Sequence, residues 1–250
     1  MTRHEEITGL LLALALLPAC GSASPSSDDA SPADAPTGTP ADAVPRAVTV
    51  ARTTTIPACT VFVDATNTGP ALGTATAPHP TIAAGVAAAS DGAIVCVAEG
   101  TYAEGLTPGV KYFTLAGGFQ TGQEFTVRDS SRYVSRAQGD GTNTFLRIED
   151  PGPTEGQLTA VDGFEITGYS QAIYRDIYYS QDMDITNNYI HDNACSPASL
   201  VGGGFALNNI TGTISGNVIA KNTCSRGGGR RGIVRALRAF GSVPLCCLEG

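Results

Sequence analysis

The stretch DITNNYIHDNAC (residues 184–195) matches TISGNVIAKNTC (residues 213–224) without a gap, at an offset of 29 residues. Isoleucine, asparagine and cysteine recur at the same places in both. The matched pairs are Ile185 with Ile214, Asn188 with Asn217, Ile190 with Ile219, Asn193 with Asn222, and Cys195 with Cys224. Upstream, VDGFEITGY (161–169) aligns with ITNNYIHDN (185–193) at an offset of 24 residues. Short strands that recur every ~20 to 30 residues, each too small to bury its own apolar face, are typical of a solenoid.

The order of residues inside the repeat indicates which solenoid this is. In ISGNVI (214–219) the isoleucines are expected to point inward, while Gly216 and Asn217 form the bend, because both residue types tolerate the left-handed backbone region. This pattern is typical of a right-handed parallel β-helix, in which aliphatic residues and asparagines stack from coil to coil. Matched residues would then lie about 4.8 Å apart. An immunoglobulin-like sandwich has a similar strand content but gives no reason for the two offsets.

The segment that begins at Cys59 adds a resemblance to a known family. It runs through VFVDATN (61–67), GTATAPHPTI (73–82), IAAGVAAA (82–89), AIVCVAEGTY (93–102) and YFTLAGGF (112–119). This order resembles the opening of bacterial pectate-lyase-like right-handed β-helix proteins, and the resemblance covers residues 59–225. It implies an all-β right-handed parallel β-helix solenoid with a short N-terminal capping helix. Ile82 and Val86 would form the inward stripe of that helix, with Thr81 as its N-cap.

The N-terminus has the features of an export signal. The apolar run from Ile7 to Leu17 is too short to span a bilayer, which takes about 20 residues, but it suits the apolar region of a signal peptide. The following LPAC resembles the lipobox of bacterial lipoproteins, which implies lipidation of Cys20; an ordinary cleaved signal is the alternative. Residues 1–20 are therefore assigned to a lipoprotein-type signal. Residues 21–58, rich in Ser, Pro, Ala and Asp, are assigned to a disordered linker.

The charge is unevenly distributed along the chain. The formal net charge is −8, and residues 226–250 contain five arginines and one glutamate (+4), so residues 1–225 carry −8 − 4 = −12. An acidic body argues against nucleic acid as a partner. The arginine-rich segment 226–250 breaks the repeat and is assigned to an atypical tail. A frameshift or truncated reading frame is favoured over a basic peptide for anionic surfaces. We expect an incomplete solenoid with an exposed C-terminal edge that is prone to pairing.

The seven cysteines fall into groups. Cys20 belongs to the lipobox, Cys59 and Cys96 are placed to fasten the cap region, and Cys195 and Cys224 are expected to pair between neighbouring coils. Cys246 and Cys247 lie in the tail. No other cysteines lie close together in the sequence, so we predict no metal site.

Possible catalytic residues gather in one part of the sequence. A lyase acting on uronates needs a base such as arginine, and commonly aspartates that hold Ca²⁺, whereas a hydrolase needs two carboxylates. Tyr174, Tyr178 and Tyr179 are candidates for stacking on sugar rings. The candidate catalytic residues are Arg175, Asp176, Asp182, Asp184, His191 and Asp192.

Each candidate also has a structural interpretation. Asp182 and Asp184 flank a strand start, where short polar residues bond to backbone. His191 is replaced by Ala220 in the matching coil, and Arg175 is explained equally well by a surface ion pair. We therefore expect a monomeric, exported and lipid-anchored protein of the cell envelope, in the outer membrane, in the periplasm or at the cell surface. It is expected to bind polysaccharide or another surface, without a cofactor. The alternative is an enzyme that acts on acidic polysaccharides, either a polysaccharide lyase, for which Ca²⁺ is the candidate cofactor, or a glycoside hydrolase.

Overall fold

Thirteen strands and one short helix follow one another in the residues that the computed structural model describes, which are 54–109, 111–148, 158–175, 181–194, 203–223 and 232–245. All of these ranges belong to the unit Val44–Gly250. The elements in chain order are β1 (Val61–Val63), α1 (Ile82–Ala88), β2 (Ala93–Ala98), β3 (Gly100–Tyr102), β4 (Phe113–Phe119), β5 (Ser135–Gln138), β6 (Thr144–Ile148), β7 (Leu158–Asp162), β8 (Phe164–Thr167), β9 (Gln171–Arg175), β10 (Gln181–Thr186), β11 (Tyr189–His191), β12 (Phe205–Ala220) and β13 (Gly232–Leu245).

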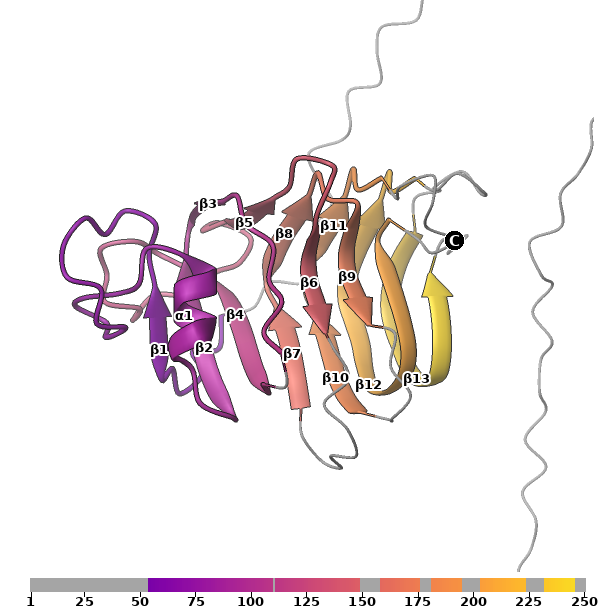
Figure 1. The fold of residues 1–250 in the computed structure, drawn as a ribbon, viewed down its shortest axis with the longest axis horizontal. Helices are drawn as coiled ribbons and strands as arrows, with labels where there is room; N and C mark the ends of the chain where they lie inside the picture. Colours follow the sequence, from indigo (N-terminus) through magenta and orange to yellow (C-terminus); the bar gives the residue numbers. More distant parts are fainter. Residues whose placement is uncertain are drawn as a thin grey trace, which may run out of the picture. The chain divides into compact units, whose positions relative to one another are not determined.

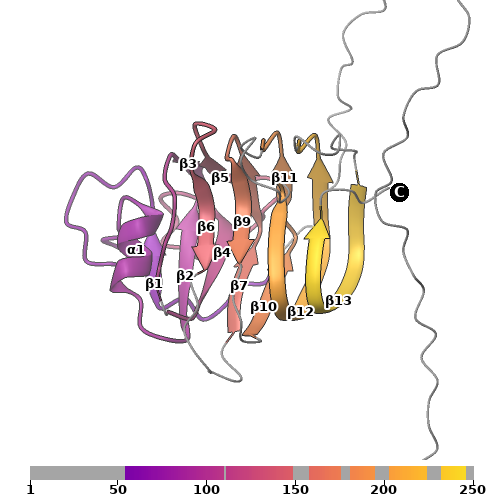
Figure 2. The ribbon, with the colours of Figure 1, turned by 45° about the vertical axis from the view of Figure 1, so that its right-hand side comes forward.

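The strands form three parallel rows that meet in β12. The first row is β1-β2-β4-β7-β10-β12, the second is β3-β5-β8-β11-β12, and the third is β6-β9-β12. The long strand β12 contributes to all three because its successive parts pair with β9, β10 and β11. Figures 1 and 2 show the rows side by side, with the colours advancing along the stack in sequence order. This all-β topology is compatible with a parallel β-solenoid.

The strand register agrees with both repeat offsets. Ile185 pairs with Ile214 and Ile190 pairs with Ile219, which are the matches at an offset of 29 residues. On the other side Ile185 pairs with Val161, a match at an offset of 24 residues. The aliphatic side chains of these positions are buried in the main apolar cluster between the three rows. The prediction that the repeats stack coil on coil is therefore confirmed.

Two ladders of buried asparagines connect the later coils. Oδ1 of Asn217 accepts hydrogen bonds from the backbone N–H of Asn188 at 2.9 Å and from its side-chain amide at 3.0 Å. Oδ1 of Asn222 accepts the equivalent pair from Asn193, at 3.0 and 2.9 Å. All four side chains are buried. Because a buried amide must find partners, these bonds fix the height of one coil above the next.

The residue before each ladder asparagine occupies the left-handed backbone region. Asn187 and Gly216 have φ of 56° and 65° and precede Asn188 and Asn217. The expectation that Gly216 and Asn217 share the bend is thus refined: Gly216 adopts the positive φ, and Asn217 extends into the core as a ladder residue. In the second turn of the coil the same position is taken by Asp192, with φ of 52°.

The helix α1 is fixed at both ends by the segment that follows β3. Thr81 is the N-cap, as predicted, and its side chain accepts from the N–H of Ala84 at 3.1 Å. The carboxylate of Glu104 accepts from the N–H groups of Ile82 and Ala83 at 2.7 and 2.8 Å. Nζ of Lys111 donates to three carbonyls at the C-terminal end of the helix. These charges suit the helix dipole, and they hold the buried Ile82 and Val86 against the first coil.

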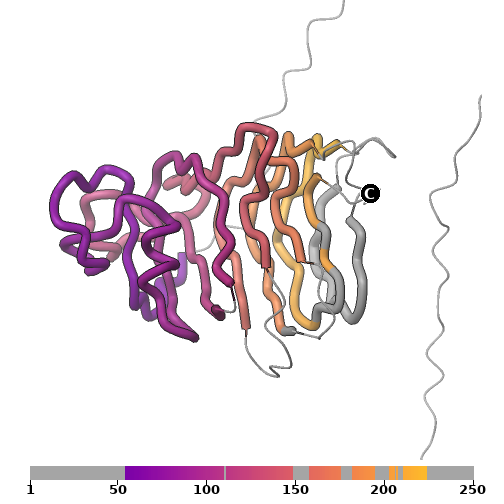
Figure 3. Tube along the Cα trace, viewed as in Figure 1, coloured from indigo at the N-terminus to yellow at the C-terminus, as the bar shows by residue number. Residues whose placement is uncertain are grey.

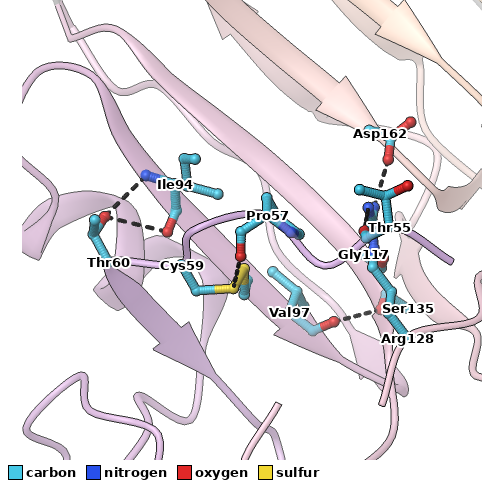
Figure 4. Close-up of a disulfide and its surroundings, with 11 residues drawn as sticks. Thr55, Pro57, Cys59, Thr60, Ile94, Val97, Gly117, Arg128, Ser135 and Asp162 are labelled. Carbon is cyan, nitrogen blue, oxygen red and sulfur yellow. Dashed lines mark hydrogen bonds and ion pairs between the residues drawn. A yellow bond between two sulfur atoms is a disulfide. The ribbon is translucent and has the colours of Figure 1, made fainter. Parts of the chain in front are cut away.

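The beginning of the domain is fastened by a disulfide and by a buried arginine. Cys59 and Cys96 form the predicted disulfide, which joins the lead-in to β1 with β2 (Figure 4). Arg128 is only 7% exposed. Its guanidinium donates to the carbonyls of Thr55 and Gly117 at 2.9 Å each and lies 2.5 Å from the carboxylate of Asp162 (Figure 4). Arg128 thereby connects the entering chain, β4 and β7.

The strand β13 lies in the segment that the sequence assigned to an atypical tail. It pairs antiparallel with β12 from Phe205 to Ile219, and this is the one antiparallel pair among the named strands of the described residues. The exposed edge expected beyond the last coil is therefore covered along β12. In the tube view of Figure 3, the coloured traces of the successive coils can be followed as far as the later part of β12.

Candidate functional site

The catalytic candidates of the sequence do not form one cluster in the described structure. Asp182 and Asp184 lie on β10, in the first row of strands, whereas His191 lies on β11, in the second row, and Asp192 lies in the turn after it. Arg175 is the last residue of β9, in the third row. Asp176, Tyr178 and Tyr179 lie outside the described residues, as do Cys20, Cys195 and Cys224.

The side chain of Arg175 does not lie on the surface. Only 1% of the residue is exposed, and it is the largest of the fully buried side chains. The interpretation of Arg175 as a surface ion pair is therefore wrong. Burial also separates its guanidinium from any polymer that binds to the outside of the coils.

The two aspartates of β10 face outward and alternate with Met183 and Ile185, whose side chains are buried. Oδ1 of Asp184 accepts from the backbone N–H of Thr213 in the next coil at 2.8 Å. This bond supports the interpretation that Asp184 has a structural role and bonds to backbone. The backbone partner, however, lies in the next coil and not in the same strand. Asp182 stands beside Leu158 and Thr211 in the strand register.

Among the candidate residues that the structure describes, His191 has polar partners at both of its ring nitrogens. Its Nδ1 lies 2.6 Å from Oδ2 of Asp192, and its Nε2 lies 3.1 Å from Oε1 of Glu165 on the neighbouring strand β8. The imidazole also stacks on the ring of Tyr189, with 4.0 Å between the ring centroids. The His191 side chain is 14% exposed, so the ring is held in place while its edge still reaches the surface.

Glu165 links His191 to an arginine one coil earlier. Nε of Arg136 lies 3.0 Å from Oε1 of Glu165, and Nη2 donates to Oε2 at 3.2 Å. The sequence reasoning missed both residues. The offset of 24 residues that places Tyr189 over Glu165 was the available signal, because it put a carboxylate on the outer face next to the repeat that contains His191.

The two linked groups shift each other's ionisation. Burial raises the pKa of Glu165, but hydrogen bonds and charge from His191 and Arg136 outweigh burial, so the pKa lies below its ordinary value. Burial likewise lowers the pKa of His191, and the contacts with Glu165 and Asp192 outweigh it, so this pKa is raised. Both shifts favour an ionised carboxylate beside an imidazolium.

This geometry decides what His191 can do chemically. A general base must reach the proton that it abstracts with a ring nitrogen. Both nitrogens of His191 already face carboxylates, which stabilise the charged ring and occupy its two hydrogen-bonding positions. The cluster is therefore suited to presenting a fixed pattern of charges and donors, and poorly suited to proton transfer.

The cluster belongs to a longer outer polar row, which we define as Thr101, Arg136, Glu165 and Tyr189. These residues come from β3, β5, β8 and β11 and stand directly beside one another in the strand register. Neighbouring members of a parallel row are separated by about 4.8 Å. The outer polar row therefore presents one polar or aromatic side chain per coil on the second row of strands.

The described residues give no sign of a metal centre or a membrane span. Across these ranges no three His, Cys, Asp or Glu side chains gather closely enough to hold a metal ion. The helix α1 has seven residues, and the described part of the chain contains no helix long and apolar enough to cross a bilayer.

No family model matches the chain, no curated protein matches it, and no solved structure matches it.

Proposed function

We propose that the chain is an exported, lipid-anchored right-handed β-helix protein of the cell envelope, related to the pectate-lyase-like proteins, that binds polysaccharide through its outer polar row. The single observation that carries this proposal is the register of Thr101, Arg136, Glu165 and Tyr189 on four successive strands. A linear polymer with repeating hydroxyl groups is complementary to a linear series of polar side chains. A right-handed β-helix is proposed because crossover connections between parallel strands are almost always right-handed.

The proposal of export rests on the sequence. The apolar run from Ile7 to Leu17, the LPAC motif ending at Cys20 and the Pro-rich and Ser-rich linker suit a domain tethered to a membrane by a lipid. A polymer-binding surface at the end of such a tether would hold an envelope polysaccharide close to the membrane.

Binding is favoured over catalysis by the positions of the candidate residues. Arg175 is buried, both nitrogens of His191 face carboxylates, and Asp184 bonds to the backbone of the next coil. No two of these groups are arranged as an acid and a base around a shared open position in the described residues. A lyase or hydrolase of acidic polysaccharides therefore has less support.

The test is retention of the protein without its signal on immobilised polysaccharides, with soluble sugar release measured in the same samples. Arg136→Gln should weaken retention by at least about fivefold, since it removes a charged member of the outer polar row. Arg147→Gln is the matched control, because Arg147 is an exposed arginine of β6 in the third row. Equal retention of the two variants would refute binding through this surface.

The enzyme alternative is tested in the same samples. Release of unsaturated or reducing sugars from uronate polymers, with and without Ca²⁺, would overturn the proposal of a binding protein. Loss of that release in Arg175→Ala, together with an unchanged thermal unfolding midpoint, would assign the reaction to Arg175.

A further inference from the structure

A depression opens at the N-terminal end of the second row of strands. It has a volume of about 340 Å³ and lies between β3, the turn after β1 and the segment that follows β4. It is open to solvent. The side chains that determine its chemistry are Thr66, Glu99, Thr101, Thr121, Arg132 and Arg136.

One wall of the depression is a pair of oriented hydroxyl groups. Oγ1 of Thr66 donates to Oδ1 of Asp64 at 2.7 Å, and Oγ1 of Thr121 donates to Oδ2 of the same carboxylate at 2.5 Å. Asp64 is buried, and it also accepts from the backbone N–H of Thr66 at 2.9 Å. Each threonine hydroxyl has a single proton, and Asp64 receives both. The two oxygens lie 3.1 Å apart, within hydrogen-bond distance of each other, and a hydroxyl oxygen whose proton is engaged still has lone pairs that can accept a hydrogen bond.

The other side of the depression supplies donors and a further acceptor. Arg132 is exposed, and its guanidinium carbon lies over the ring of Tyr133, 5.2 Å from the ring centroid. Arg136 donates one hydrogen bond to Glu165, through Nη2, and a guanidinium carries five N–H donors in all. Oε1 of Glu99 accepts from the backbone N–H of Thr121 at 3.3 Å, which holds this carboxylate beside the threonine pair.

The mixture of donors and acceptors selects the chemical class of ligand. A phosphate or carboxylate offers mainly acceptor oxygens, which would meet the lone pairs of Thr66 and Thr121 and the charge of Glu99. A sugar hydroxyl both donates and accepts, so two adjacent ring hydroxyls can donate to the threonine oxygens and accept from Arg132. The two positive charges of Arg132 and Arg136 are offset by the negative charges of Glu99 and Glu165, and the carboxylate of Asp64 adds one further negative charge, which also disfavours an anionic ligand. The acidic body of the chain, −12 over residues 1–225, disfavours an anionic ligand further.

We propose that this depression binds one ring of a neutral sugar through two adjacent hydroxyl groups, with Thr66 and Thr121 as acceptors and Arg132 as donor. The inference rests on the proposed polysaccharide-binding function and specifies its ligand. Arg136 lines the depression and is also a member of the outer polar row. A polymer that places one ring in the depression is therefore positioned to continue along the strands toward His191.

The test is NMR titration of the folded domain with neutral methyl glycosides of glucose, galactose and mannose, and separately with inorganic phosphate and galacturonate. The amide signals of Thr66 and Thr121 should shift and approach saturation with at least one neutral glycoside, up to about 50 mM, which detects millimolar dissociation constants. Phosphate and galacturonate should bind at least about fivefold more weakly.

Two variants identify the contacts. Thr121→Val keeps the shape of the side chain and removes its hydroxyl, and Arg132→Gln removes the donor from the other side. Each should weaken glycoside binding by at least about fivefold. Thr126→Val is the matched control, because it makes the same change at an exposed threonine in the same segment, outside the depression. A thermal melt of each variant shows whether it is folded. If Thr121→Val does not fold, Arg132→Gln still tests the site.

The outcomes separate this inference from the proposed function. Polysaccharide retention by the wild type without any glycoside effect at Thr66 and Thr121 overturns the sugar-ring site alone. Glycoside binding in the depression without retention on any polysaccharide overturns the proposed function alone. Tighter binding of phosphate or galacturonate than of every neutral glycoside overturns the assignment of a neutral sugar.

Discussion

Asn217 accepts two hydrogen bonds from Asn188 through one side-chain oxygen, and both residues are completely buried. The side-chain amide of Asn217 in turn donates to the carbonyl of Ile185 at 2.6 Å. One asparagine therefore satisfies groups on two parts of the preceding coil. The stacking of coils depends on this exchange as well as on apolar burial, because backbone and amide groups left without partners would be costly inside the fold.

Removing this asparagine should destabilise the domain strongly. Asn217→Ala leaves two donors of Asn188 and the carbonyl of Ile185 without their partner, which we expect to cost about 3 kcal/mol of unfolding free energy. Denaturant unfolding of the purified domain measures the loss. Asn187→Gly is the control, since glycine also accepts the positive φ at that turn; it removes one side-chain hydrogen bond, to Asp162, and should cost about 1 kcal/mol or less. Equal losses would show that the ladder has no special role.

The cluster around His191 should make stability depend on pH. The folded-state pKa of His191 is raised, so its contribution is complete below its unfolded pKa of about 6.5 and is lost as pH rises through the folded value. The folded-state pKa of Glu165 is lowered, so its contribution is present above its unfolded pKa of about 4.5 and is lost as pH falls through the folded value. Both contributions are present together between these two unfolded values.

His191→Gln measures this effect. The difference in thermal unfolding midpoint between wild type and variant should be largest near pH 6 and should shrink as the pH rises through the folded pKa of His191. In an NMR titration, Glu165→Gln should lower the pKa of His191 toward its ordinary value. A difference that grows with rising pH, or a His191 pKa that does not respond to Glu165→Gln, would contradict the assigned contacts.

The disulfide at the start of the domain should contribute substantially to stability. Cys59 and Cys96 are 37 residues apart in sequence, and closing a loop of this length stabilises a fold by about 4 kcal/mol in the chain-entropy model. The double variant Cys59→Ser/Cys96→Ser should lose a large part of this amount in denaturant unfolding. Adding a reductant should then have little further effect on the first coil. An unchanged unfolding free energy in the double variant would contradict this account.

A second disulfide is expected between Cys195 and Cys224. Both cysteines lie outside the described residues, but Ala194 and Thr223, which directly precede them, form a parallel bridge. Peptide mapping of the non-reduced protein by mass spectrometry should therefore find one peptide pair that contains Cys195 and Cys224. A pair that joins either residue to Cys246 or Cys247 would be inconsistent with the stacking of these two coils.

The repeat made the coil register predictable, and the polar surface was harder to predict. Ile185 over Ile214 and Ile190 over Ile219 follow from identical residues at a fixed offset, and the structure confirms both pairs. The cap of α1 by Thr81 was also predictable, because its signals are local. Glu104 and Lys111, which hold the two ends of the helix, lie more than 20 residues beyond all of these partners and carry no such local signal.

The candidate site shows the same division. A sequence pattern tells which residues alternate outward, but not which outward residues of different coils come together. His191 and Asp192 were recognised as candidates, whereas Glu165 and Arg136 were missed because their contacts span 26 and 29 residues. Arg175 was assigned to the surface because it stands beside polar residues in sequence, and its burial follows from the packing of β9 between β6 and β12.

The central claim is that polysaccharide binds along the second row of strands. The most direct measurement is amide chemical-shift mapping of the folded domain with an oligosaccharide of a polymer that retains it. We predict that the shifted signals follow β3, β5, β8 and β11, with Thr101, Arg136, Glu165 and Tyr189 among them. Shifts that concentrate instead on β7 and β10, around Asp182 and Asp184, would contradict it.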